Sequence, residues 1–138
     1  MRIVHGRAEP APSERRRETI TGEAWFDPVL PATDGTTITT VFFSPAARTY
    51  WHRHEHGQIL QVLAGRGLIC ADGGRPRVIS AGDTVWVPAG ERHWHGAAPD
   101  SFLTHTAISL GVTRWAEAVA EAEYATPPGD GEDDTADD

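Results

Sequence analysis

Six of the seven histidines in this chain of 138 residues fall in or just after two short segments. The first segment, 50–58, reads YWHRHEHGQ, and the second, 88–95, reads PAGERHWH. The six residues are His52, His54, His56, His93, His95 and His105. Histidine is the commonest metal ligand in proteins and the usual proton carrier near neutral pH. Two such segments, each beside a turn, indicate a metal site inside a β-barrel.

The spacing of His52 and His54 places both side chains on one face of a strand, about 6.6 Å apart along the backbone. Two imidazoles at this spacing can bind one ion. Gln58 begins the next strand-like run, and an adjacent antiparallel strand brings it back to the same inner face. His93 follows a turn and can supply a fourth ligand from another hairpin. The residues alone therefore predict a site made by two separate strand pairs.

A simpler interpretation is that these histidines are exposed polar residues near turns, and for a single histidine we would prefer it. The second His-x-His pattern, at His93 and His95, favours a metal site because it lies on a separate strand. His56 falls in the turn after the first pair, and we expect it to be exposed.

Short runs of β-branched, aromatic and aliphatic residues, separated by glycine-containing turns, make up most of the chain. We expect a loop at Asp27-Pro28 and turns at 32–35, Gly73-Gly74 and 81–83. This pattern predicts an all-β fold, an antiparallel β-sandwich or jelly-roll barrel. The expected strands are 19–26, 36–45, 48–54, 58–67, 68–72, 75–80, 84–88 and 101–110.

The length of the chain predicts one domain, which we place at 19–126. Residues 1–18 read as an extended N-terminal arm, either flexible or paired with the sheet of a neighbouring copy. Apolar residues at helical spacing predict one C-terminal helix at about 113–124. Residues 127–138 are acidic and almost free of apolar side chains, and we expect this tail to be disordered.

The formal net charge is −8, but six of the 20 acidic residues and no basic residue lie in 130–138, so the rest of the chain carries only −2. Without a basic face to neutralise phosphates, we expect no nucleic-acid partner. No apolar stretch approaches the length of a membrane span, and none near the start resembles a secretory signal. A single cysteine, Cys70, excludes an internal disulfide. We therefore expect a cytoplasmic protein that does not bind membranes.

The two histidine segments resemble the two motifs of the cupin superfamily. In the first motif, His52-x-His54 is followed by Gln58 and, after six residues, by Gly65. In the second, Gly82 is followed by five residues, then by Pro88-x-Gly90, two further residues and His93. The resemblance covers about 38–110 and implies the jelly-roll barrel of that superfamily.

Three positions depart from the cupin motifs. Ala46 stands where the first motif opens with glycine, Ala97 replaces the closing asparagine of the second, and Gln58 stands where a glutamate is usual. The finer pattern is similar to a small single-domain bacterial subgroup, which includes cupins related to carboxymuconolactone decarboxylase-type proteins and manganese-dependent cupin hydroxynitrile lyases. In that subgroup glutamine is usual at this position. The resemblance implies the metal ligands His52, His54, Gln58 and His93 and the pocket histidines His95 and His105.

Three neutral imidazoles and one neutral amide would leave a divalent ion its full charge of +2. Such a site favours anionic ligands, for example an alkoxide, enolate, carboxylate or cyanide. An amide oxygen with imidazoles suits manganese, iron, cobalt, nickel or zinc, and we favour manganese or iron on the resemblance.

Two candidate acid/base residues lie beside the expected ligands. His95 is either a proton carrier or a residue that orients a ligand. His105 is either a pocket base or a satisfied core histidine. Arg48 could bind a substrate carboxylate or form a structural salt bridge, and Cys70 reads as inert core.

Several functions fit these residues. The leading hypothesis is a metal-dependent enzyme of the lyase or isomerase type that acts on a small organic molecule, with hydroxynitrile lyase activity as one version. A metal-dependent dioxygenase and a non-catalytic sensor with a structural metal are the alternatives. We also expect a homodimer, because an open sheet edge needs to be covered. The sequence identifies neither the substrate nor the metal.

Overall fold

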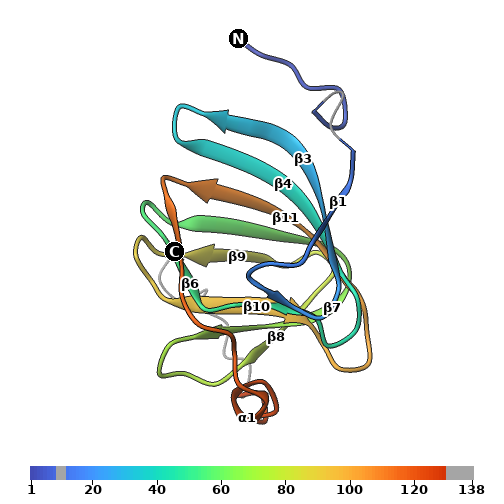
Figure 1. The fold of residues 1–138 in the computed structure, drawn as a ribbon, viewed down its shortest axis with the longest axis vertical. Coiled ribbons are helices and arrows are strands. Elements are labelled where there is room, and N and C mark those ends of the chain that lie inside the picture. The colour runs from blue at the N-terminus through green and yellow to red at the C-terminus, as the bar shows by residue number, and fades with distance from the viewer. Residues whose placement is uncertain (9–11, 130–138) are drawn as a thin grey trace.

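The computed structural model describes residues 1–8 and 12–129, and this part of the chain forms a nearly closed antiparallel barrel of two facing sheets (Figure 1). One sheet contains β1, β3, β4, β11, the first part of β7, and β9; the other contains β8, the second part of β7, β10, β5, β6, β2 and β12. The strands are β1 (Glu14–Arg16), β2 (Ile20–Thr21), β3 (Ala24–Thr33), β4 (Thr36–Phe43), β5 (Arg48–Thr49), β6 (His52–His54), β7 (Gln58–Ala71), β8 (Arg77–Ser80), β9 (Thr84–Val87), β10 (His93–Ala97), β11 (Leu103–Leu110) and β12 (Thr113–Trp115). The helix is α1 (Glu121–Tyr124). The all-β prediction is confirmed.

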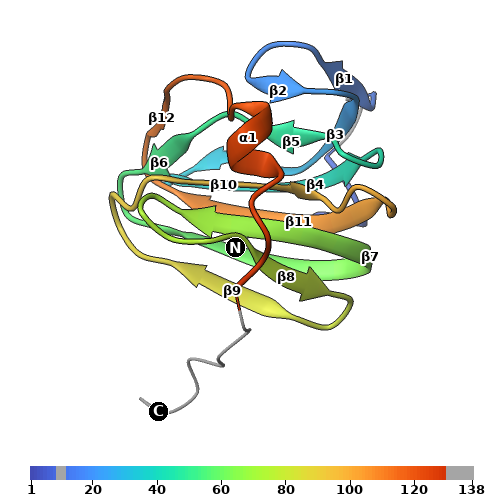
Figure 2. The ribbon, with the colours of Figure 1, turned by 90° about the horizontal axis from the view of Figure 1, so that it is seen from below.

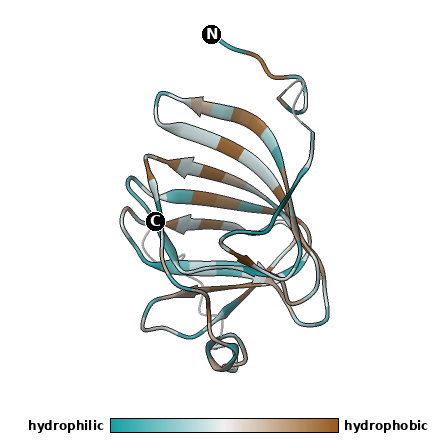
Figure 3. Ribbon diagram, in the orientation of Figure 1, coloured by the Kyte–Doolittle hydropathy of each residue, from teal (hydrophilic) through white to brown (hydrophobic). Residues whose placement is uncertain are grey.

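Strand alternation explains the core. Val41 and Phe43 of β4 are buried whereas Phe42 between them is exposed, and Figure 3 shows the same alternation of hydropathy along the strands. Side chains that point inward from facing strands form one apolar cluster, which includes Leu60 and Leu103. This cluster fills the part of the barrel that the histidines leave free.

A second apolar cluster lies on the outer face of the second sheet, beneath α1 (Figure 2). Tyr124 of α1 packs against Trp94, with ring centroids 5.7 Å apart, and its hydroxyl donates a hydrogen bond of 2.6 Å to the carbonyl of Ala97. The C-terminal segment therefore covers the strand that carries His93 and His95.

One long strand joins the two sheets. The sequence predicts two runs, 58–67 and 68–72, but β7 is continuous and pairs with β9 and β11 in its first part and with β8 and β10 in its second. Gly65 has φ = 79°, and a Cβ there would lie 2.0 Å from the carbonyl oxygen of Phe102. This glycine gives β7 the left-handed backbone that lets it cross from one sheet to the other.

Two local predictions are wrong. The expected loop at Asp27-Pro28 lies inside β3, where Pro28 is accommodated at a register shift in the pairing with β4. The predicted helix over 113–124 is restricted to Glu121–Tyr124, because Thr113–Trp115 form β12 and pair with β6 instead. Pairing with an open strand outweighs the local helical preference of this segment.

The N-terminal arm folds onto its own barrel. β1 pairs with β3 of the first sheet, and β2 pairs with β5 of the second, so the chain crosses from one sheet to the other (Figures 1 and 2). The predicted disordered tail lies, from residue 130 onward, outside the described residues. In the described part of the chain, no helix is long and apolar enough to cross a membrane.

Ala46, which replaces the opening glycine of the first cupin motif, has φ = 68°. This left-handed backbone is unfavourable for alanine but not for glycine. We expect Ala46→Gly to raise the free energy of unfolding by about 1 kcal/mol, or about 4 °C in Tm. Thermal denaturation checks this. Ala81→Gly, at an exposed turn position without positive φ, is the control and should be mildly destabilising. An equal effect of both substitutions would contradict the prediction.

Candidate metal centre

The predicted site residues converge from four strands. His52 and His54 lie on β6, Gln58 begins β7, and His93 is the cross-strand neighbour of His52. All of these side chains are buried, as are His95 of β10 and His105 of β11. The antiparallel register of β10 with β6 therefore brings the two His-x-His motifs together, as the sequence predicts.

His52, His93 and His95 form the tightest group. Each offers a ring nitrogen, and these atoms lie within 4.8 Å of one another, which is close enough to hold one metal ion. The ring centroids of His52 and His93 are 4.3 Å apart. His54 adjoins this group, with its ring centroid 4.9 Å from that of His52. Sequence reasoning placed His95 as a pocket residue, and the structure shows it as close to His52 and His93 as a ligand would be.

The rings of the three predicted histidine ligands are held from outside by oxygen atoms. In His52 and His93 the oxygen is a backbone carbonyl, which can only accept a hydrogen bond. Nδ1 of these two rings must therefore carry the proton, which leaves the lone pair of Nε2 free. Such outer contacts fix the tautomer and orientation of metal-binding histidines. At 2.9 Å each, they join Nδ1 of His52 to the carbonyl of Tyr50, Nδ1 of His54 to Oγ1 of Thr113, and Nδ1 of His93 to the carbonyl of Glu91.

Gln58 shows that this donor set fits a cation. Its amide nitrogen donates a hydrogen bond of 3.1 Å to Oγ of Ser109, which turns its Oε1 toward the cluster. That Oε1 lies 3.1 Å from Nε2 of His93, although His93 already carries its proton on Nδ1. Two lone pairs this close are repulsive unless a cation lies beside both. Nε2 of His54 is also buried, and no residue in 1–8 or 12–129 forms a hydrogen bond with it. The residues present therefore fit a divalent metal.

Burial keeps all these histidines neutral. It lowers the pKa of His52 and His95 well below the usual 6.5, and that of His93 also falls. The pKa of His54 falls to about 4 through burial and the nearby charge of His93, and burial lowers that of His105 to about 4. Neutral imidazole is the form that binds metals, so the cluster is ready for an ion at neutral pH.

These shifts predict acid sensitivity of the metal-free protein. Below pH 6.5 the unfolded chain binds protons on these histidines while the folded chain does not, so the free energy of unfolding falls as pH falls. For His105 alone, its pKa falls from 6.5 to about 4 on folding. This shift corresponds to about 3 kcal/mol of the free energy of unfolding, which is lost progressively as the pH falls from 6.5 to 4. Urea denaturation between pH 7 and 5, above the usual range of carboxylates, measures the slope. His105→Leu should reduce it, and a flat profile would contradict the prediction.

His95 and His105 form a buried pair. Nε2 of His105 lies 3.0 Å from Nδ1 of His95, and the Phe43 ring packs against both imidazoles. The remaining ring nitrogens, Nε2 of His95 and Nδ1 of His105, are buried and have no hydrogen-bond partner among the described residues. Two imidazoles joined by one hydrogen bond can pass a proton between them. The pair lies beside the metal-binding group because His95 belongs to both.

The other residues considered in the sequence have structural roles. The buried side chain of Arg48 forms a salt bridge of 2.8 Å to the exposed Glu121 and lies over the ring of Tyr124, so it is not available to a substrate. Burial raises the pKa of the Cys70 thiol to about 11, which makes it inert. His56 is exposed, as predicted.

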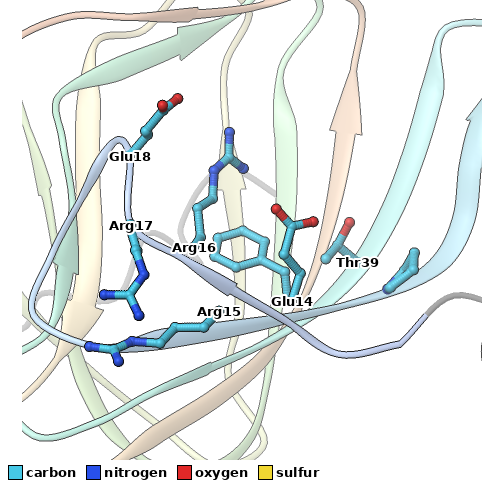
Figure 4. A pocket seen from close by; sticks show the side chains of 8 residues that line it. Glu14, Arg15, Arg16, Arg17, Glu18 and Thr39 are labelled. Carbon is cyan, nitrogen blue, oxygen red and sulfur yellow. The ribbon is translucent and has the colours of Figure 1, made fainter.

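Sequence reasoning missed a cavity of about 620 Å³ between the arm and the inner faces of β3 and β4. Its walls include Glu14 and Arg16 of β1, Phe26 of β3 and Thr39 of β4 (Figure 4). It also missed Trp115, whose ring centroid is 4.5 Å from that of His52. Only the tertiary pairing of β1 with β3 and of β12 with β6 brings Arg16 and Trp115 to this end of the barrel.

Comparison with known proteins agrees with this geometry. The model of the cupin domain family matches residues 39–104. The chain is 42% identical over 111 residues to the (R)-mandelonitrile lyase of Granulicella tundricola, covering 76% of this chain and 85% of that protein. The chain belongs to the cupin superfamily.

Solved structures support the same assignment. A cupin-like protein from Thermotoga maritima is 35% identical, with a TM-score of 0.78 over 85% of this chain and 94% of its own. The polyketide cyclase RemF from Streptomyces resistomycificus shares the fold at 21% identity, with a TM-score of 0.68 over 90% of each chain. Together with the histidine cluster, these relatives fit a metal-binding cupin enzyme.

Proposed function

We propose that this chain is a metal-dependent lyase that cleaves and forms hydroxynitriles, with a divalent metal held by His52, His54, Gln58 and His93. The observation that carries the proposal is the inward-facing set of neutral donors, in which Oε1 of Gln58 and Nε2 of His93 face each other at 3.1 Å. The identity to a mandelonitrile lyase supports the choice of reaction. Manganese and iron suit this donor set.

The chain's own residues account for the proton movements. When bound, the divalent ion would polarise the substrate hydroxyl and favour its alkoxide. The His95–His105 pair accepts the hydroxyl proton, because both rings are neutral and partly unpaired. The bond between the carbinol carbon and the nitrile carbon then breaks, and its electron pair leaves with cyanide. The protonated pair returns the proton to give hydrogen cyanide and an aldehyde.

Two measurements test the proposal. Element-resolved mass spectrometry of freshly purified, untagged protein should find close to one manganese or iron per chain. That protein should release benzaldehyde from mandelonitrile, followed by its ultraviolet absorbance, and His52→Ala should not. Oxygen uptake without benzaldehyde release would favour the dioxygenase alternative. Tightly bound metal with neither activity would favour the sensor.

The remaining parts of the proposal concern partners. The cavity of about 620 Å³ suits a small molecule. A homodimer stays a prediction, and the partly exposed side chains Phe42 and Phe102, stacked 5.8 Å apart on the outer face of the first sheet, offer an apolar surface for a second copy. Light scattering of the purified protein measures its mass in solution.

A further inference from the structure

We infer that the substrate of this site carries a carboxylate group, and that Arg16 of the N-terminal arm binds it. The inference rests on the proposed function for the place where the substrate reacts. Its own support comes from the surroundings of Arg16, which do not depend on which reaction follows.

Arg16 spans the mouth of the barrel between the two sheets. Its guanidinium carbon lies 5.0 Å from the ring centroid of Phe26 on β3 and 5.2 Å from that of Trp115 on β12. Trp115 in turn packs against His52, with ring centroids 4.5 Å apart. A single indole ring therefore separates the Arg16 cation from the candidate metal ligands.

Arg16 differs from the other shielded arginines. Three other arginines that are buried or half-buried pair with carboxylates, whereas the side chain of Arg16 makes no hydrogen bond or ion pair with any residue that the structure describes. The three pairs are Arg7 with Asp27, Arg48 with Glu121, and Arg92 with Asp72 and Glu117.

The two aromatic rings orient the guanidinium without using its hydrogen bonds. Contact with the two ring faces uses none of its hydrogen-bond donors, so the five N–H groups of the guanidinium remain available to a ligand. A planar fork of donors matches a carboxylate in two parallel hydrogen bonds. A half-buried cation without a partner is unfavourable, and an anionic ligand would remove that cost.

The cavity beside Arg16 reaches the inner face of the first sheet at Phe26 and Thr39. Thr39, which lines the cavity, is the cross-strand neighbour of Ala107, and Ala107 shares the inner face of β11 with His105. Glu14, two residues before Arg16, points to the same side of β1 and disfavours a second anionic group at that end. The cavity therefore has room for one carboxylate beside Arg16, and Trp115 links this end of the barrel to His52.

Calorimetric titration with two matched probes tests this inference without any turnover. The probes are 4-(hydroxymethyl)benzoate and its neutral methyl ester, each added to manganese-loaded and to metal-free protein. The variants are Arg16→Met, Arg16→Lys and the control Arg114→Met. The control removes the same charge beside Trp115 on β12, but the Arg114 side chain is exposed and does not line the cavity.

We expect the wild type to bind the carboxylate at least tenfold tighter than the ester, with and without manganese. Arg16→Met should lower the affinity for the carboxylate at least tenfold and the affinity for the ester less than twofold. Arg16→Lys should give an intermediate affinity for the carboxylate. Arg114→Met should change either affinity less than twofold. Equal losses in Arg16→Met and Arg114→Met, or no preference for the carboxylate, would overturn the inference. Because the metal-free titration does not involve the reaction, it separates this outcome from a failure of the proposed lyase activity.

Discussion

Replacing His93 with alanine is expected to abolish metal retention, lowering the affinity by at least about 100-fold. His93 lies between the other donors: its ring is 4.3 Å from that of His52, and its Nε2 is 3.1 Å from Oε1 of Gln58. The hydrogen bond between its Nδ1 and the carbonyl of Glu91 directs Nε2 toward these donors. His52→Ala should have the same effect. The measurement is metal content by mass spectrometry after gel filtration in the presence of a weak chelator.

His56→Ala is the matched control, because this histidine lies close in sequence but is exposed and outside the cluster. It should retain metal as the wild type does. Stoichiometric metal in both His52→Ala and His93→Ala would show that the ion is held elsewhere. The circular dichroism spectrum of each variant should match the wild type, so that lost metal is not confused with lost fold.

The same measurement separates two ligand sets. The first set, from spacing and resemblance, has His54 as the third histidine ligand beside His52 and His93. The second has His95 instead, because the ring nitrogens of His52, His93 and His95 lie within 4.8 Å of one another. Nδ1 is engaged in both rings, by Thr113 in His54 and by His105 in His95, so these hydrogen bonds do not separate the two sets. The first cupin motif includes His54, and we therefore expect His54→Ala to lose metal and His95→Ala to keep it. The reverse result would make His95 the ligand.

The positions of the site histidines could be predicted because they depend on local geometry. A two-residue period fixes the face of His52 and His54, and the turn before His93 fixes where the next strand begins. The cupin motifs then supplied the register between these segments. The long β7 was harder to predict, because Gly65 and Gly67 look like the end of a strand, although here they let one strand serve both sheets.

The arm and β12 could not be predicted for a physical reason. Glu14–Arg16 have no apolar alternation, and 113–124 has the local character of a helix. Both become strands because β3 and β6 each offer unpaired backbone groups at an edge. Trp115, Thr113 and Arg16 reach the site only through this long-range pairing, so a functional residue on either segment leaves no signature in the sequence.

His105→Ala is expected to keep the metal but to lower the rate of hydroxynitrile cleavage about 10²- to 10⁴-fold, the range of a lost proton carrier. His105 touches the cluster only through its hydrogen bond to His95. Its removal therefore leaves the donors His52, His54, Gln58 and His93 in place while interrupting proton transfer. Benzaldehyde release from mandelonitrile measures the rate, and metal content is determined on the same sample. Thr106→Val, one residue further along β11 with its side chain on the opposite face, is the control.

A structural role for His105 would give a different pattern. Its ring is fully buried beside Phe43, so a cavity alone would lower Tm and loosen substrate binding. His105→Gln fills much of that space and keeps a hydrogen bond to His95 but cannot accept a proton at neutral pH. If His105 carries the proton, the glutamine variant should be as slow as the alanine variant, and the pH dependence of kcat should change in both. Recovery of the rate in His105→Gln would show instead that the ring only positions His95.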